Sequence, residues 1–156
     1  MNIQELLSEK NVAYEAIPHA DTYDAQHLAQ ELHTNGRQVA KTVLLRADHG
    51  FTYIVAVLPA PMTIDFAKVA AAFGDCKIEL ATEAEIQERC PDCEFGVLPP
   101  FGSRYEMKTV VDESLTKNKE IIFEGNTHHE AIRMRYADFQ QIEEPLVAPF
   151  AVPPHA

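Results

Sequence analysis

Cysteine, positive charge and long apolar runs are all scarce in this sequence. The three cysteines, Cys76, Cys90 and Cys93, are an odd number, and the amino-terminal residues include acidic groups and no long apolar run. A disulfide framework and a secretory signal are therefore not expected. Since no later stretch is long and apolar enough to cross a bilayer, we expect a soluble, cytoplasmic protein with no membrane partner.

Basic residues are outnumbered, with 13 Lys and Arg against 24 Asp and Glu and a formal net charge of −11. Proteins that coat nucleic acid do so mainly through many Lys and Arg contacts to phosphate. The charge therefore argues against DNA as a partner and against general coating of RNA. A local contact to a few phosphates is still compatible with it, because the sequence does not show whether the basic residues share one face.

Several well-known catalytic motifs are also missing. The chain has no Gly-x-Ser-x-Gly elbow, no Walker lysine loop, no dinucleotide fingerprint and no His-Glu-x-x-His helix. Its carboxylates are numerous but show no arrangement that singles out an acid/base pair. We therefore expect no cofactor and no catalytic metal, and any chemistry has to come from other residues.

The pattern of apolar residues predicts one domain of the α+β class. The length of 156 residues and 46% apolar content suffice for a single core. Two apolar runs at 39–47 and 51–58, separated by Asp-His-Gly, predict a hairpin. Helices are predicted at 2–10, 24–32, from 63 or 65 to 73, and at 82–89 and 136–142, and further strands at 12–17, 78–81, 109–112, 120–123 and 131–134. Because these elements do not alternate strictly, we expect a mixed, mostly antiparallel sheet with surrounding helices.

Prolines predict where regular structure stops. The stretch 91–104 contains three prolines and two glycines and is predicted to be a long loop. The last residues, 143–156, contain four prolines. We expect the domain to span residues 1–142 and residues 143–156 to form a loosely attached tail without regular elements.

Lys41 is the first candidate for function. It lies in Val39-Ala-Lys-Thr-Val-Leu-Leu45, where alternation places its side chain on one face of an otherwise apolar strand. Such a position suits a cation that is held rigidly toward a phosphate or carboxylate. The alternative is an edge-strand lysine that discourages aggregation.

The segment Gly96-Val-Leu-Pro-Pro-Phe-Gly102 is the second candidate. Two glycines bracket an apolar stretch, so backbone N–H groups can approach a ligand without an intervening side chain. Such donors can hold a water or a developing oxyanion. The alternative is a stiff surface loop that Phe101 attaches to the core.

The third candidate is the turn Gly125-Asn-Thr-His-His129. A histidine there can bind a ligand or act as an acid or base near neutral pH. Adjacent histidines on a strand face opposite sides, so at most one of His128 and His129 is expected to enter a pocket. The alternative is an ordinary solvated turn.

The fourth candidate is Cys90-Pro-Asp-Cys93. A zinc site needs two further ligands, which His128 or His129 would have to supply. A redox pair is expected where a helix begins after a strand, whereas this pair falls at a predicted helix end. We therefore interpret these cysteines as incidental thiols.

Three of these segments together resemble a known family. In their order and spacing, Val39-Ala-Lys-Thr-Val-Leu-Leu45, the loop 96–102 and Gly125-Asn-Thr-His-His-Glu-Ala-Ile-Arg-Met134 resemble the YbaK-type aminoacyl-tRNA deacylases. That family is related to the editing domain of bacterial prolyl-tRNA synthetases. The resemblance extends from the first predicted helix to about Ile142, and it implies a YbaK-like α+β fold.

The resemblance also implies roles for individual residues. It implies that Lys41 holds the terminal adenosine end of a tRNA, and that Gly102 acts with it in catalysis as part of the loop backbone that holds the ester or its water. The ester would be cleaved without a protein nucleophile, since an activated ester needs mainly positioning, a held water and stabilisation of the carbonyl oxygen. Further binding residues implied by the resemblance are Gly96, Pro100, Phe101, Gly125 and His128.

The function expected from this resemblance is trans-editing. The chain would deacylate mischarged tRNA, with alanine or cysteine on the tRNA for proline as the expected substrate. Its partners would be the tRNA acceptor end with its amino acid and, as a further candidate, an aminoacyl-tRNA synthetase. A non-catalytic module that binds the acceptor end or a partner protein is the alternative.

Overall fold

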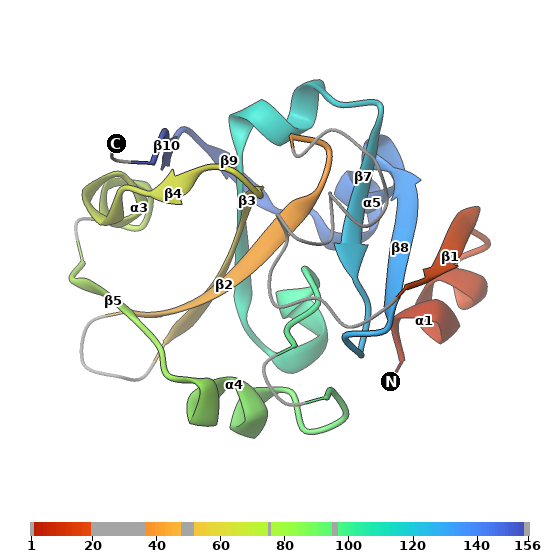
Figure 1. Cartoon of the computed structure of the whole chain (residues 1–156). Helices are drawn as coiled ribbons and strands as arrows, with labels where there is room; N and C mark the ends of the chain where they lie inside the picture. Colours follow the sequence, from red (N-terminus) through yellow and green to blue (C-terminus); the bar gives the residue numbers. More distant parts are fainter. Residues whose placement is uncertain (1, 20–36, 48–51, 75, 95–96, 155–156) are drawn as a thin grey trace.

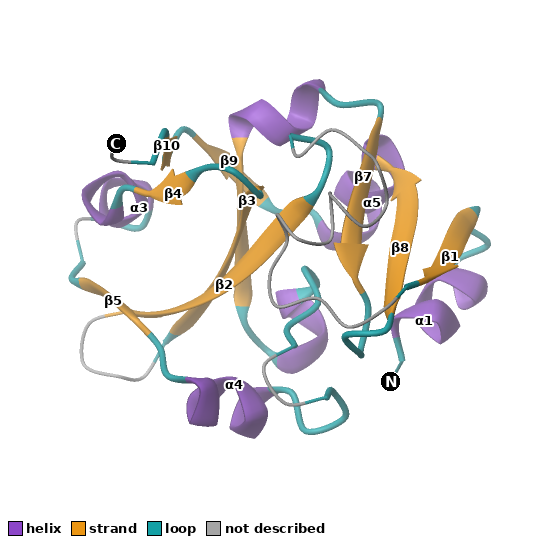
Figure 2. Ribbon diagram, in the orientation of Figure 1, coloured by secondary structure: helices purple, strands orange, loops and turns teal. Residues whose placement is uncertain are grey.

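A computed structural model describes residues 2–19, 37–47, 52–74, 76–94 and 97–154 (Figure 1). Strands occupy the middle of the molecule and helices lie around them (Figure 2). The helices are α1 (Ile3–Glu9), α3 (Phe66–Ala72), α4 (Glu83–Arg89), α5 (Tyr136–Glu143) and two 3-10 turns, η2 (Gly102–Tyr105) and η3 (Glu113–Lys117). The strands are β1 (Tyr14–Pro18), β2 (Ala40–Ala47), β3 (Tyr53–Pro59), β4 (Thr63–Ile64), β5 (Ile78–Leu80), β6 (Lys108–Asp112), β7 (Glu120–Glu124), β8 (Glu130–Arg135), β9 (Leu146–Ala148) and β10 (Ala151–Val152).

The largest sheet has five strands in the order β5-β2-β3-β6-β9. The pairs of β2 with β3 and with β5 are antiparallel, whereas β3 with β6 and β6 with β9 are parallel. A second, antiparallel sheet has the order β1-β8-β7. A bridge between Val39 and Ile122 joins the two sheets at the start of β2. The expected α+β class with mixed, mostly antiparallel pairing is confirmed.

Both faces of the five-stranded sheet are covered. Leu44 of β2 packs into one apolar cluster together with α1, Phe101 and Phe123. Its neighbour Leu45 points the other way, into a second cluster that contains Val69 of α3 and Phe150. This alternation is the period-two pattern of a strand that is buried on both sides.

Local signals account for two helix starts. The carboxylate of Asp65 accepts the backbone N–H groups of Ala67 and Lys68, and thereby caps α3. Thr82 and Glu85 form the predicted capping box of α4. Of the two predicted starts the one at Asp65 is confirmed, and Thr63 belongs to β4. The predicted helix at 24–32 and the hairpin turn at 48–50 lie outside the described residues.

The carboxyl-terminal segment contradicts the expectation of a tail without regular elements. β9 extends the main sheet beside β6, and β10 pairs with β4. Phe150 between them is fully buried, and its backbone N–H, like that of Ala151, donates to Oδ1 of Asp112. Long-range pairing thus orders a segment whose prolines lie beside the short strands. The boundary of the domain at residue 142 stays a prediction.

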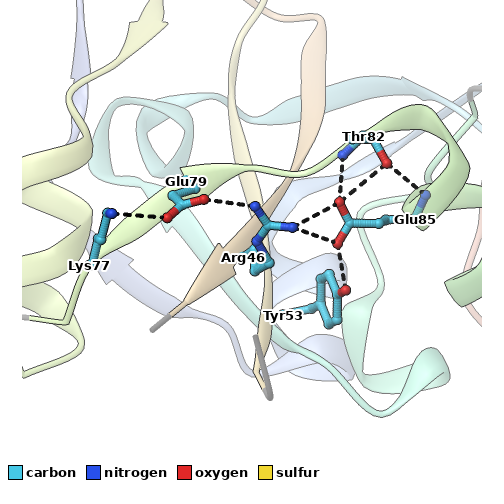
Figure 3. A network of polar contacts seen from close by, with 6 residues as sticks. All are labelled: Arg46, Tyr53, Lys77, Glu79, Thr82 and Glu85. Atoms are coloured by element: carbon cyan, nitrogen blue, oxygen red, sulfur yellow. Dashed lines mark hydrogen bonds and ion pairs between the residues drawn. The ribbon is translucent and has the colours of Figure 1, made fainter. Parts of the chain in front are cut away.

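A polar network holds the other end of β2 (Figure 3). Arg46 donates to Glu79 at 2.7 Å and contacts Glu85 at 3.4 Å, while the hydroxyl of Tyr53 donates to Glu85 at 2.5 Å. These contacts join β2, β3, β5 and α4. Within the part of the chain that the structure describes, no helix has the length and apolar character needed to span a membrane.

Candidate functional site

Lys41 is the second residue of β2 and is partly buried. It lies opposite Leu58, and both Leu58 and Val43 belong to the apolar cluster beneath α3. Side chains that share a register position or are two residues apart lie on the same face, so Lys41 lies on this face. At Lys41 the pairing strand is β3, whereas β5 pairs with β2 only from Leu45 to Ala47, so the alternative of an edge-strand lysine stays open.

The described part of the glycine-bracketed loop, residues 97–102, is buried along its whole length. Phe101 is fully buried and meets Phe123 and Phe139 edge-on, with ring centroids 5.7 Å and 5.3 Å apart. Edge-to-face packing of this kind is favourable beyond the area it buries. Pro100 is also buried, and Gly96 lies outside the described residues. Phe101 thus attaches the loop to the core.

Gly102 occupies a position without room for a side chain. A Cβ atom there would lie 2.6 Å from Oγ1 of Thr109 and 2.9 Å from a methyl carbon of Val55. Its backbone N–H donates to Oγ1 of Thr109 at 3.0 Å. This amide is already satisfied by the protein, so the expected role of Gly102 as a backbone donor to the ester does not fit the structure.

Behind Gly102 lies a buried carboxylate that the sequence did not single out. Glu143, the last residue of α5, accepts hydrogen bonds from the backbone N–H of Ser103 at 3.0 Å and from the hydroxyl of Ser103 at 2.6 Å. It also accepts the hydroxyl of Thr109 at 2.6 Å. A cleft of about 490 Å³ adjoins this cluster, and Leu146 and Phe73 form part of its wall. Only tertiary structure reveals this cluster, because Glu143 lies 34 residues beyond Thr109.

The turn after β7 is held by Asn126. Its side-chain oxygen accepts the backbone N–H of Ile3 at 2.9 Å, and its backbone oxygen accepts the N–H of Glu94 at 2.8 Å. Its amide group also donates to Sγ of Cys93 at 3.5 Å. Gly125 beside it is buried and donates its N–H to the carbonyl of Glu130. The turn and the segment leading into the loop 97–102 are therefore adjacent.

The two histidines of the turn differ in their surroundings. The side chain of His128 is 26% exposed, and its Nδ1 lies 3.3 Å from Oε2 of Glu124. The side chain of His129 is 59% exposed, and its Nε2 lies 3.9 Å from Oε1 of Glu94. The backbone N–H of His128 approaches the other oxygen of Glu94 at 3.4 Å. Of the two, His128 is the more enclosed.

Cys90 and Cys93 form a disulfide, so the interpretation as incidental thiols is wrong. The two cysteines flank the turn that follows α4, and Asp92 lies within the same turn. The hydroxyl of Tyr105 donates to Asp92 at 3.1 Å, and burial is the main reason that the pKa of Tyr105 is raised. Among the described residues, the one group of potential metal ligands consists of Cys90, Asp92 and Cys93. The S–S bond uses both sulfurs of this group.

The candidate residues thus fall into two sets. The loop 97–102 and the turn at Gly125 belong together, connected through Asn126 and Cys93. Gly102 contacts Val55, and Val55 lies opposite Leu44, three residues along β2 from Lys41. Three residues of a strand span about 10 Å. Val55 belongs to the apolar cluster of Phe101, whereas Lys41 lies on the face of the other cluster, beneath α3. Lys41 and Gly102 therefore lie on opposite sides of the sheet.

Residues 19–142 match the model of the aminoacyl-tRNA editing domain. This match covers most of the chain. The chain belongs to the aminoacyl-tRNA editing family. Editing is hydrolysis of the ester that joins an amino acid to its tRNA, so the chain is a hydrolase of aminoacyl-tRNA. The resemblance to YbaK-type proteins is confirmed at the level of the family.

Individual relatives agree with this membership. The chain is 26% identical over 148 residues to the multifunctional Ser/Thr-tRNA deacylase ProXp-y of Escherichia coli K12, covering 93% of this chain and 88% of that one. A solved hypothetical protein superposes with a TM-score of 0.83 at 17% identity and covers 96% of this chain and 99% of that one. A proposed trans-editing enzyme for prolyl-tRNA synthetase gives 0.80 at 19% identity, with 96% and 94% covered. These two solved structures have the same fold as this chain.

Proposed function

We propose that this chain acts in trans, as a free-standing cytoplasmic enzyme that removes a wrongly attached small amino acid from tRNA. The observation that carries the proposal is the extent of the match. The editing-domain model covers 124 residues, from 19 to 142. The chain also covers 88% of the deacylase ProXp-y and 99% of a solved structure of the same fold. One solved neighbour of the same fold is named as a proposed trans-editing enzyme for prolyl-tRNA synthetase, which favours action in trans.

In this proposal Lys41 binds the acceptor end of the tRNA. Its ammonium group is carried by a partly buried side chain near the start of β2. A lysine fixed by a rigid strand can place one phosphate accurately without a basic surface, which is compatible with the net charge of −11. The contact to tRNA is proposed to be confined to the acceptor end.

The loop 96–102 and the turn at Gly125 line the aminoacyl pocket in this proposal. Lys41 lies on the other face of the sheet, about 10 Å along β2, so it would hold the acceptor end at a distance from the ester. The amide of Gly102 is used by Thr109, so its part is to let the backbone pass close to the sheet. His128, the more enclosed histidine, borders the pocket. Hydrolysis needs a held water and an oriented ester more than a nucleophile, because the aminoacyl ester is already activated. A hydroxyl of the terminal ribose can help to orient that water.

The amino acid is proposed to be small. The resemblance to the YbaK-type family favours alanine or cysteine on the tRNA for proline. The name of the relative ProXp-y adds serine and threonine. These side chains differ by few atoms, and an editing pocket separates such substrates mainly by size and by hydrogen bonds to hydroxyl groups. An aminoacyl-tRNA synthetase remains a proposed partner that would supply the mischarged tRNA.

A panel of labelled aminoacyl-tRNAs tests the proposal. The panel carries alanine, cysteine, serine, threonine or proline, and release of the amino acid is followed with time. We expect turnover of at least one small amino acid and protection of proline on its own tRNA. Lys41→Ala should lower kcat/KM on the order of 10²-fold, because a misplaced acceptor end loses the reactive geometry. Lys119→Ala removes an exposed lysine and is the matched control.

The same panel separates catalysis from simple binding. A wild-type protein that releases no amino acid would contradict the proposal. If such a protein binds tRNA, and the binding weakens in Lys41→Ala, the alternative of a non-catalytic acceptor-end module is favoured. Equal activity of wild type and Lys41→Ala would contradict the role of the lysine alone.

A further inference from the structure

We propose that Glu143 is a positioning residue for deacylation, acting through Thr109 and Ser103 on the backbone at Gly102. The proposal rests on the proposed function, because it assumes that the loop ending at Gly102 lines the aminoacyl pocket. Glu143 itself touches no substrate in this account. It sets where the loop lies.

Glu143 belongs to α5 and reaches the loop from the opposite end of the sequence. Its side chain is 7% exposed and accepts three hydrogen bonds, two from Ser103 and one from Thr109. A carboxylate at this depth is costly unless donors satisfy it. Its place at the carboxyl end of a helix adds an unfavourable interaction with the helix dipole. The three donors offset both costs, so the cluster holds together as a unit.

From this cluster a chain of hydrogen bonds leads to the loop. The hydroxyl of Thr109 donates to Glu143, and the same oxygen accepts the backbone N–H of Gly102. A hydroxyl has one proton to donate, so its donation to Glu143 leaves its lone pairs directed at Gly102. The carboxylate thereby fixes the orientation of Thr109. Hydrogen bonds in such a series also strengthen one another.

The position of Gly102 depends on these hydrogen bonds more than the position of a residue with a side chain would. Gly102 has no side chain that could pack, and its backbone lies so close to Thr109 and Val55 that a Cβ atom does not fit. The neighbouring Phe101 is held by aromatic packing. At Gly102 and Ser103 the position of the backbone is set by polar contacts that end on Glu143.

The test compares Glu143→Leu with Glu144→Leu in steady-state deacylation. Leucine has a similar size but no acceptor atom, so all three bonds are lost, whereas the amide of Glu143→Gln can still accept from Thr109 and from the backbone of Ser103 and can donate to the Ser103 hydroxyl. We expect kcat to fall about tenfold in Glu143→Leu and much less in Glu143→Gln, with KM nearly unchanged because Lys41 still binds the acceptor end. Glu144 is the exposed neighbour on the same helix end, and its variant should match wild type.

Variants of Thr109 test the route of the effect. Thr109→Val removes both the donor to Glu143 and the acceptor for Gly102 and should lower kcat on the order of 10²-fold. Thr109→Ser keeps the hydroxyl and should restore most of the activity. Melting temperatures measured alongside show whether each variant is folded at the assay temperature.

Three outcomes are decisive. A selective fall in kcat of the folded Glu143→Leu protein, with most of the activity kept in Glu143→Gln and in Thr109→Ser, supports the proposal. Full kcat in Glu143→Leu at temperatures well below its melting point overturns it, and shows that the cluster only stabilises the fold. If Lys41→Ala still lowers the activity in that case, the proposed function is intact, whereas a wild type without any turnover contradicts the proposed function itself.

Discussion

The backbone N–H of Ile3 donates to the side-chain oxygen of Asn126 at 2.9 Å, across 123 residues of sequence. This bond satisfies an N–H in the first turn of α1 that has no partner within the helix. It also fixes the turn that carries Gly125 and His128. The first helix therefore supports one side of the proposed pocket without contacting a substrate.

Asn126→Ala is expected to destabilise the protein by about 1–3 kcal/mol, because it leaves the buried end of a helix without an acceptor. Urea denaturation of wild type and variant measures this difference. Asn126→Asp is the comparison variant, since it retains the acceptor for Ile3 but loses the amide donor to Cys93 and adds a negative charge. A loss of stability in Asn126→Asp as large as in Asn126→Ala would contradict the importance of the bond to α1.

Phe101→Ala is expected to lower the free energy of unfolding by about 3–5 kcal/mol, the usual cost of removing a buried aromatic ring. Phe66 is 42% exposed, and Phe66→Ala should change stability by less than about 0.5 kcal/mol. Thermal and chemical denaturation provide the measurement. A raised KM in Phe101→Ala with unchanged stability would instead identify Phe101 as a direct substrate contact.

The disulfide between Cys90 and Cys93 leads to a prediction about thiol content. The denatured, unreduced protein should show one reactive thiol, that of Cys76, and the reduced protein should show three. Because the closed loop is very short, reduction should cost no more than about 2 kcal/mol of stability. Three reactive thiols before reduction, in protein prepared without reductant, would contradict the bond.

The pH dependence of stability should reveal the contact between Tyr53 and Glu85. The hydrogen bond from Tyr53 lowers the pKa of Glu85, and the same bond to Glu85 raises the pKa of Tyr53. A lowered carboxyl pKa stabilises the fold above the unfolded-state pKa of about 4.3, and this contribution is lost as pH falls through the lower folded pKa. A raised tyrosine pKa stabilises the fold below about 10, and that contribution is lost as pH rises through the folded pKa.

Tyr53→Phe removes both contributions while it keeps the ring that lies under Arg89. The difference in stability between wild type and Tyr53→Phe should therefore be largest near neutral pH and should shrink at both acidic and strongly basic pH. Tyr14→Phe serves as the control, because among the described residues the hydroxyl of Tyr14 contacts only Gln4, at 3.4 Å. A difference that is constant across pH would contradict the assignment.

The elements that could be predicted from sequence are those whose signals are local. Alternation in β2 and the capping box at Thr82 and Glu85 depend on residues a few positions apart, and both were confirmed. The pairing of β9 with β6 depends on partners more than thirty residues apart. The prolines near β9 predicted an irregular tail, but they do not prevent a short strand on the edge of a sheet.

The same distinction applies to the site. The sequence identified Lys41, the loop and the turn as candidates, yet it could not show that Thr109 uses the amide of Gly102. It also missed Glu143, since a glutamate at the end of a helix is ordinarily solvated. The disulfide at Cys90 was missed because a short spacing alone does not distinguish a bonded pair from two separate thiols.

The burial of Phe150 bears on how the protein is made in the cell. The cluster beneath α3 is incomplete until residues 146–152 have been synthesised and have left the ribosome, since β9, Phe150 and β10 complete it. A nascent chain that already contains the whole of residues 19–142 would still expose this apolar face. A nonsense mutation soon after residue 142 should therefore yield a product that chaperones retain and proteases degrade, even though it spares every residue proposed here to contact tRNA.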